Sequence, residues 1–375
     1  MTAPLAVSGS ELPWPDDTPE VKQAAGLDTL PKLLAHNALL HPKAIAQREK
    51  EFGIWVPYDW ESVETHVARM AVGFAGLGLG PGDIVALIGD NRPEWVWGEV
   101  AAHACRAMSL GIYRDALEEE IRYLFDYAQP KIVVAEDEEQ VDKLLALGDA
   151  IPSVVAIVYT DPRGMRKYDD PRLIPIETLE AAGKDALDLS PNLWRDMVGA
   201  TRGDDVAILC TTSGTTAHPK LAMWTGTAFI DHAASYLRAD PRGPDDEYVA
   251  VLPLSWVMEQ MYSVAWNFLA RMKVNFPEEE QTTMADLREI GPTFVLFSPR
   301  VWETVAADIR ARIMDSKRWK RAIYDWGVAK GMAAVAHGGH SGAADLLLFR
   351  HLRDRLGFTN LKSAATGGAA MGPDT

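Results

Sequence analysis

The sequence predicts an α/β protein made of two similar halves, each with a mostly parallel sheet covered by helices. Short apolar segments of strand length alternate with segments of helical periodicity, and this alternation occurs twice along the chain. The 375 residues exceed the usual size of a single hydrophobic core. A composition of 47% hydrophobic and 24% charged residues is typical of a globular protein. We therefore expect two subdomains, at residues 27–200 and 201–375.

The first half begins with an amphipathic helix. Its apolar positions recur at helical spacing, and glycines at 78 and 80 end it; these positions are Val63, Val67, Met70, Ala71 and Phe74. A strand follows at 84–90, and Pro93 lies in the first turn of the next helix. The same pattern predicts a helix near 117–125, a strand at 131–135 and a helix at 138–147. Alternation of this kind favours parallel strands.

The second half contains strand-like apolar segments at 206–210, 248–252, 273–276 and 293–297. Residues 161–204 are poorer in pattern and richer in Pro, Asp and Arg, so we expect an exposed excursion there. Residues 1–26 are acidic and rich in proline, which predicts an N-terminal arm.

Charge and cysteine content exclude several classes of protein. The net charge of −16 and the pI near 5.0 argue against a nucleic-acid partner, because such binding depends on Lys and Arg neutralising phosphates. Cys105 and Cys210 lie in apolar sequence, which indicates reduced core residues and a cytoplasmic location. No apolar segment approaches the roughly 18 to 20 residues needed to cross a bilayer, and the N-terminus lacks the pattern of a signal peptide.

The segment from Ala207 to Thr225 has the composition of a phosphate-binding loop that follows a buried strand. It combines hydroxyl donors, a glycine that permits close approach to an anion, and a mobile cation: Thr211, Thr212, Ser213, Gly214, Thr215, Thr216 and Lys220. The Walker A motif requires Gly directly before the Lys, but here Pro219 stands before Lys220, so that motif is excluded. The segment suits a polyphosphate.

Residues Thr212 to Lys220 resemble the phosphate loop of the AMP-forming acyl-CoA synthetases, with Ala217 where that family usually has Gly. Other segments resemble the long-chain fatty acyl-CoA synthetase branch: 89–95, 251–260, 298–303 and 316–326. Trp256 stands where the branch usually has His, and two interpretations are open: an indole that narrows or gates the acyl tunnel, or a core side chain. Residues 365–374 resemble the family's Gly-Gly-Ala segment.

The resemblance implies the layered αβαβα fold of that family's large N-terminal domain. It implies ATP, Mg²⁺ and coenzyme A as cofactor and co-substrates, and a fatty acid as substrate. By the same resemblance Lys220 is the catalytic residue and binds phosphate together with Thr212, Ser213, Gly214, Thr215 and Thr216. Gly367, Gly368, Ala369 and Trp256 are expected beside the adenine and the acyl group. The metal ligands stay unassigned, and peripheral contact with the inner face of a membrane stays open.

In the family, an adenine-contacting segment with the metal-binding carboxylate and a small C-terminal domain with a second catalytic Lys follow the Gly-Gly-Ala segment. None of these matches residues of this sequence. We therefore expect the N-terminal portion of a long-chain fatty acid:CoA ligase, inactive or weakly active by itself. The alternative is a scaffold of the same fold that binds acyl groups or nucleotides without chemistry.

Overall fold

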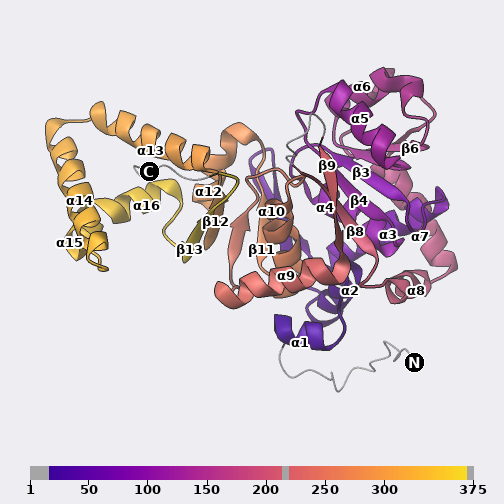
Figure 1. The fold of residues 1–375 in the computed structure, drawn as a ribbon, viewed down its shortest axis with the longest axis horizontal. Coiled ribbons are helices and arrows are strands. Elements are labelled where there is room, and N and C mark those ends of the chain that lie inside the picture. Colours follow the sequence, from indigo (N-terminus) through magenta and orange to yellow (C-terminus); the bar gives the residue numbers. More distant parts are fainter. Residues whose placement is uncertain (1–16, 213–218, 370–375) are drawn as a thin grey trace.

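The computed structural model describes residues 17–212 and 219–369, whose strands form two sheets (Figure 1). The seven-stranded sheet has the order β7-β6-β5-β3-β4-β8-β9. Its strands are β3 (Ile84–Ile88), β4 (Met108–Ile112), β5 (Ile132–Ala135), β6 (Ala156–Tyr159), β7 (Leu173–Pro175), β8 (Val206–Thr212) and β9 (Lys220–Thr225). All neighbours are parallel except β8 and β9, which form an antiparallel pair.

The six-stranded sheet has the order β13-β12-β10-β11-β1-β2. Its strands are β1 (Ile45–Glu51), β2 (Ile54–Asp59), β10 (Glu247–Val249), β11 (Lys273–Phe276), β12 (Phe294–Phe297) and β13 (Ser363–Thr366). Only the β1–β2 hairpin is antiparallel. The expectation of two mostly parallel sheets is confirmed.

The two sheets exchange strands along the chain. β1 and β2 come from the first half but join the six-stranded sheet, where β1 pairs with β11. β8 and β9 follow residue 200 but join the seven-stranded sheet, where β8 pairs with β4. The expected boundary at residue 200 therefore does not coincide with the division between the sheets.

Helices fill the space between the sheets and cover both outer faces, which gives five layers. Along β3, Val85 and Leu87 point into a central core that also holds Phe294 and Leu296 of β12. The central layer contains α2 (Leu30–Leu40), α3 (Trp60–Gly76), α4 (Pro93–Ala104), α9 (Gly226–Ala239) and a continuous helical stretch formed by α10 (Val257–Glu259), the π-helical turn η3 (Gln260–Ala265) and α11 (Trp266–Ala270).

The outer faces have cores of their own. Ile84, Ala86 and Ile88 of β3 pack with α5 (Glu118–Ala128) and α6 (Glu138–Leu147). Val295 and Phe297 of β12 pack with α12 (Thr283–Ile290) and Phe358. The alternation of side chains along each strand thus produces the αβαβα layering.

The expected excursion at 161–204 is wrong for much of its length. It contains β7, α7 (Ile176–Leu189) and α8 (Leu193–Ala200). Ile176 and Leu179 of α7 are buried in the central core, and an added Cβ at Gly73 of α3 would lie 2.8 Å from Leu179. The close approach of α7 to α3 therefore depends on a glycine.

The start of the described chain is held by polar contacts. In α1 (Pro19–Ala24), the buried Lys22 donates to Asn37 Oδ1 at 2.8 Å and to the carbonyl oxygen of Leu269 at 3.0 Å. Burial lowers the pKa of Lys22 to about 8, against the opposing effect of Asp17. Residues 17–26 are thus anchored on the central layer.

The helices of residues 299–356 extend away from both sheets (orange to yellow in Figure 1), and we name them the helical projection. They are α13 (Pro299–Met314), α14 (Arg318–Ala336), α15 (Gly342–Ala344), the π-helical turn η5 (Asp345–Phe349) and α16 (Arg350–Leu356). Gly327 of α14 lies against Leu348 of η5, so the helices pack on one another. No helix in residues 17–212 or 219–369 is long and apolar enough to span a membrane.

Candidate active site

The segment expected to bind phosphate connects β8 to β9. Thr212 is paired with Lys220 across this hairpin, and Thr212 Oγ1 donates to the carbonyl oxygen of Lys220 at 3.3 Å. Both residues are exposed, and Lys220 has no ion-pair partner among the described residues. Ser213, Gly214, Thr215 and Thr216 lie outside the described residues. The structure therefore places the two ends of the segment side by side, with a cation available at one of them.

The strand before this segment is fixed by burial. Ile208, Leu209 and Cys210 are buried, and β8 lies parallel to β4, so the hydroxyl-bearing end of β8 lies at the carboxyl edge of the sheet. In open α/β sheets, ligands bind outside this edge. The apolar sequence before Thr211 correctly predicted this strand.

Tyr123 of α5 also contacts the segment. Its hydroxyl donates to the carbonyl oxygen of Pro219 at 3.2 Å. Sequence reasoning missed this residue, because a contact between a helix and a loop 96 positions later leaves no local signal.

Trp256 and Gly367 lie against each other, although 111 positions separate them in the sequence. A Cβ atom added to Gly367 would lie 3.1 Å from Cη2 of Trp256, and one added to Gly368 would lie 3.7 Å from Cζ2. Trp256 is half-buried, with part of its surface on the central core. Gly367 directly follows β13, whereas Trp256 directly precedes α10. The structure thus brings together two of the segments that were expected to form one pocket. Ala369 is exposed and is the last residue that the structure describes.

The residue before Trp256 connects this contact to the seven-stranded sheet. A Cβ atom added to Gly111 would lie 2.8 Å from Cα of Ser255 and 3.3 Å from Cζ2 of Trp95. Gly111 belongs to β4, the neighbour of β8. The Trp256–Gly367 contact and the end of β8 therefore belong to adjoining elements at one edge of the sheet.

Asn91 fixes the backbone that leads to Trp256. Its side-chain amide donates to the carbonyl oxygens of Ala250 at 3.1 Å and Leu252 at 2.7 Å, and its oxygen accepts from the amide of Leu254 at 2.9 Å. One side chain thus supplies hydrogen-bond partners for three backbone groups of residues 250–254, which follow the end of β10. Asn91 thereby holds the 89–95 segment against the beginning of the 251–260 segment.

Arg92, the next residue, connects the two sheets. Its guanidinium pairs with Glu136 after β5 at 2.9 Å and with Glu49 of β1 at 3.3 Å. It also donates to the carbonyl oxygens of Pro277 and Glu278 after β11. Burial raises the pKa of Glu49 to about 8 in spite of the nearby Arg92. Arg92 is therefore a structural link between the sheets.

A buried carboxyl lies on the helix that follows Trp256. Glu259 accepts from the hydroxyl of Tyr248 at 2.8 Å and from Ser263 Oγ at 2.5 Å. It is completely buried, and this burial raises its pKa to about 8. Two hydroxyl donors, rather than a cation, therefore hold Glu259.

Gln260, the residue after Glu259, binds a second buried carboxyl, that of Glu99. Gln260 Nε2 donates to Glu99 Oε2 at 3.0 Å, and Ser109 Oγ donates to Glu99 Oε1 at 3.0 Å. Burial raises the pKa of Glu99 to about 7, and burial lowers the pKa of the adjacent His103 to about 4. The helical stretch that follows Trp256 is thus fixed to α4 and β4 by polar contacts inside the core.

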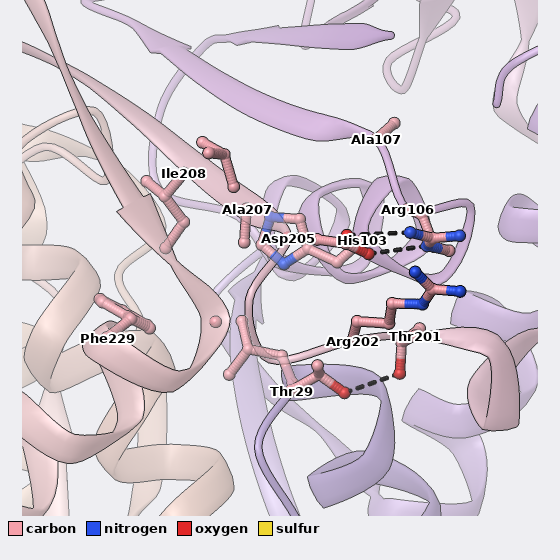
Figure 2. Close-up of a pocket in the computed structure, with 13 residues that line it drawn as sticks. Thr29, His103, Arg106, Ala107, Thr201, Arg202, Asp205, Ala207, Ile208 and Phe229 are labelled. Carbon is pink, nitrogen blue, oxygen red and sulfur yellow. Dashed lines mark hydrogen bonds and ion pairs between the residues drawn. The ribbon is translucent and has the colours of Figure 1, made fainter. Parts of the chain in front are cut away.

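A small cavity lies at the opposite end of β8 (Figure 2). Its lining includes the Arg106–Asp205 pair, with two contacts of 2.7 and 2.9 Å, and the hydrogen bond of 2.9 Å between Thr29 and Thr201. Its volume of about 20 Å³ suits a water molecule rather than a nucleotide. The carboxyl end of β8 is therefore a better candidate for the nucleotide site than this cavity.

The described residues contain no group of three or more His, Cys, Asp and Glu side chains that could hold a metal ion. The described residues therefore provide no assigned ligand set for Mg²⁺.

Comparison with known proteins identifies the class to which this fold and site belong. The family model described as AMP-binding enzyme matches residues 34–375. The chain belongs to the AMP-binding enzyme family, as its sequence resemblance indicated.

Particular relatives narrow the resemblance. The chain is 26% identical over 352 residues to long-chain-fatty-acid–CoA ligase ACSBG2 of Xenopus laevis, covering 88% of this chain and 46% of the relative. It is 24% identical over 330 residues to long-chain-fatty-acid–CoA ligase FadD15 of Mycobacterium bovis, covering 85% and 53%. The chain thus spans about half the length of the curated relatives it matches.

Solved structures support the fold. The adenylation domain of a carboxylate reductase from Mycobacterium chelonae matches with a TM-score of 0.65 and 18% identity, over 92% of this chain and 55% of that one. A fatty acyl CoA synthetase of Mycobacterium tuberculosis matches with a TM-score of 0.57 and 16% identity, over 73% and 50%. The five-layered architecture is that of adenylate-forming enzymes.

Proposed function

We propose that this chain is the nucleotide- and acid-binding portion of an AMP-forming long-chain fatty acid:CoA ligase. The observation that carries the proposal is the meeting of separate segments at one edge of the seven-stranded sheet. Thr212 and Lys220 flank the hydroxyl-rich segment there, and the adjoining elements hold Trp256 against Gly367. The long-chain-fatty-acid–CoA ligases among the relatives favour a fatty acid as substrate.

The reaction has two displacements. An oxygen of the fatty acid carboxylate forms a bond to the α-phosphorus of ATP, and the bond from that phosphorus to the pyrophosphate oxygen breaks. The thiolate of coenzyme A then forms a bond to the acyl carbon, and AMP leaves. Both steps bring negative charges together, so cations and oriented donors must stabilise the transition state.

Within this scheme Lys220 is the proposed catalytic residue, because its ammonium group is exposed beside the segment that follows Thr212. We propose that the hydroxyls and amides of Thr212, Ser213, Gly214, Thr215 and Thr216 bind the β- and γ-phosphates. Gly367, Gly368 and Ala369 are proposed to leave room for the adenine and the acyl head. Mg²⁺, when bound with ATP, would supply further positive charge.

Trp256 is proposed to limit the acyl pocket. It is half-buried between the core and Gly367, so its indole occupies space that a smaller side chain would leave open. We propose a cytoplasmic location, because Cys105 and Cys210 are both free thiols.

The test of the proposal is ATP binding and pyrophosphate release by the chain and by Lys220→Ala. We expect ATP to bind the chain and to bind Lys220→Ala at least tenfold more weakly. Lys184→Ala is the matched control, since Lys184 is exposed on α7. Equal ATP binding by all three proteins, or none, would contradict the proposal.

Pyrophosphate release separates the ligase from a scaffold of the same fold. We propose that release is weak for this chain and rises when the C-terminal half of the Xenopus relative is fused to it. ATP binding without release in the fusion protein would support the scaffold.

A further inference from the structure

Tyr123 of α5 contacts the backbone directly before Lys220, the residue at which β9 begins. Its hydroxyl donates to the carbonyl oxygen of Pro219 at 3.2 Å. The ring of Tyr123 and the side chain of Leu221 both pack against the outer core of the seven-stranded sheet. A helix from the first half of the chain is therefore connected to the start of β9 by one polar contact and by a shared apolar core.

The two peptide groups beside the Cα atom of Lys220 are held by different side chains. The group before it contains the Pro219 carbonyl, which accepts from Tyr123. The group after it contains the Lys220 carbonyl, which accepts from Thr212 Oγ1 at 3.3 Å. The proline ring also restricts φ at residue 219. These contacts therefore set the direction in which the Lys220 side chain leaves the backbone.

Lys220 and Tyr123 lie on opposite faces of the sheet. Side chains alternate between the two faces along a strand. In β9, Leu221 packs on the outer core and Trp224 packs on the central core. Lys220 therefore shares a face with Trp224, on the side of the sheet where Trp256 also packs. Tyr123 thus holds the strand from the outer side and leaves the central side open for a ligand of Lys220.

We propose that Tyr123 is a positioning residue for Lys220, because its hydroxyl fixes the backbone from which the ammonium group reaches the phosphates of ATP. Lys220 is exposed and has no ion-pair partner in residues 17–212 and 219–369. Its long, flexible side chain supplies little orientation of its own, so the orientation has to come from the backbone. Small displacements of a catalytic group lower the rate strongly. This inference rests on the role proposed above for Lys220.

Tyr123→Phe removes the hydroxyl and keeps the ring in its apolar contacts. We expect this variant to bind ATP about fivefold more weakly, the scale of one lost hydrogen bond. Tyr127→Phe is the matched control, since Tyr127 lies one turn later on α5, stacks on the ring of Tyr123 and is 59% exposed. It should bind ATP like the unaltered chain. Isothermal titration calorimetry measures both affinities, and an unchanged affinity of Tyr123→Phe would overturn the proposal.

A second comparison distinguishes positioning of Lys220 from a general structural effect. In a Lys220→Ala chain, Tyr123→Phe should change the ATP affinity by less than about twofold, because the group that Tyr123 positions has been removed. A fivefold loss that persists in this chain would show that Tyr123 acts by another route. Urea denaturation should give equal midpoints for Tyr123→Phe and Tyr127→Phe, and a large difference between them would favour a structural role.

The same proteins separate this inference from the ligase proposal. If Lys220→Ala binds ATP as tightly as the unaltered chain, the role proposed for Lys220 is wrong and this inference is wrong with it. If Lys220→Ala binds ATP weakly but Tyr123→Phe binds it normally, the role of Lys220 is supported and only positioning by Tyr123 is overturned.

Discussion

The indole of Trp256 lies 3.1 Å from the position that a Cβ atom on Gly367 would occupy. A methyl group there would require the indole to move by a few tenths of an ångström, and a branched side chain would displace it. Within residues 17–212 and 219–369, no side-chain hydrogen bond or ion pair joins the segment of Trp256 to the segment of Gly367. Their relative position is therefore sensitive to the size of these two side chains.

Gly367→Val should lower the affinity for a fatty acid about tenfold, because the valine side chain pushes the indole into the proposed acyl pocket. Binding of a fluorescent fatty acid measures this. Trp256→Ala in the same chain should restore binding, so that the two substitutions are strongly non-additive. Additive losses would show that the residues act separately.

Removing the side chain of Asn91 should destabilise the chain and disturb the segment before Trp256. Asn91→Ala leaves two carbonyl oxygens and one amide of residues 250–254 without their partner, a cost of about 2 kcal/mol. Urea denaturation measures the loss. Asn360→Ala is the control, since its amide makes one exposed hydrogen bond to Gly291, and it should cost less than about 1 kcal/mol.

At pH 9, above the raised pKa of about 8 of Glu49, Arg92→Ala should destabilise the chain by about 3 kcal/mol, since it leaves the buried, ionised carboxyl of Glu49 without its cation. Adding Glu49→Gln should recover part of this loss, because the amide carries no charge. Thermal and urea unfolding of the single and double variants check both statements. A double variant less stable than Arg92→Ala would contradict the assigned pairing.

Stability should fall as the pH rises from 6.5 to 8. The folded-state pKa of Glu259 is raised to about 8 from an ordinary 4.5, so above pH 4.5 the folded chain holds a proton that the unfolded chain has lost. Glu49 and Glu99 act in the same direction. Two groups make stability rise with pH, but outside this range. His103, whose pKa is lowered to about 4 from 6.5, does so only below pH 6.5. Lys22, whose pKa is lowered to about 8 from 10.5, does so only above about pH 8.

Glu259→Gln should reduce this dependence by up to about 1.4 kcal/mol per pH unit. Melting temperatures at pH 6.5 and 8 measure the effect. The exposed Glu119→Gln, on α5, serves as the control and should leave the slope unchanged. An identical slope for Glu259→Gln would mean that Glu259 is ionised in the folded chain throughout this range.

The local sequence predicted most elements but not how they are assembled. β3, β5, β8 and β12 were predictable because each is a short apolar segment bounded by turn residues. β1 was missed because its sequence, Ile45 to Glu51, is mostly polar. Its charged residues have partners far along the chain: Arg48 pairs with Glu247, and Lys50 pairs with Asp286. Hydrophobic periodicity reports only on neighbouring positions, so it cannot show that these charges are neutralised by residues far along the chain.

The candidate site shows the same limit. The order of motifs along the sequence indicated Thr212, Lys220, Trp256 and Gly367, and the structure brings Trp256 to Gly367. The buried carboxyls of Glu99 and Glu259 were not predicted, because the donors that hold them come from other elements. The roles of Lys220 and of the segment after Thr212 stay predictions until ATP binding is measured.

The exchange of strands between the sheets has a consequence for synthesis on the ribosome. β1 leaves the exit tunnel more than 200 residues before β11, the strand on which its inner edge pairs. During that interval the β1–β2 hairpin has an open edge that carries Arg48, Glu49 and Lys50. Charged side chains on an unpaired edge oppose association with other strands. The polar sequence that hid β1 from prediction thus protects the nascent chain from aggregation until its partner strand has been made.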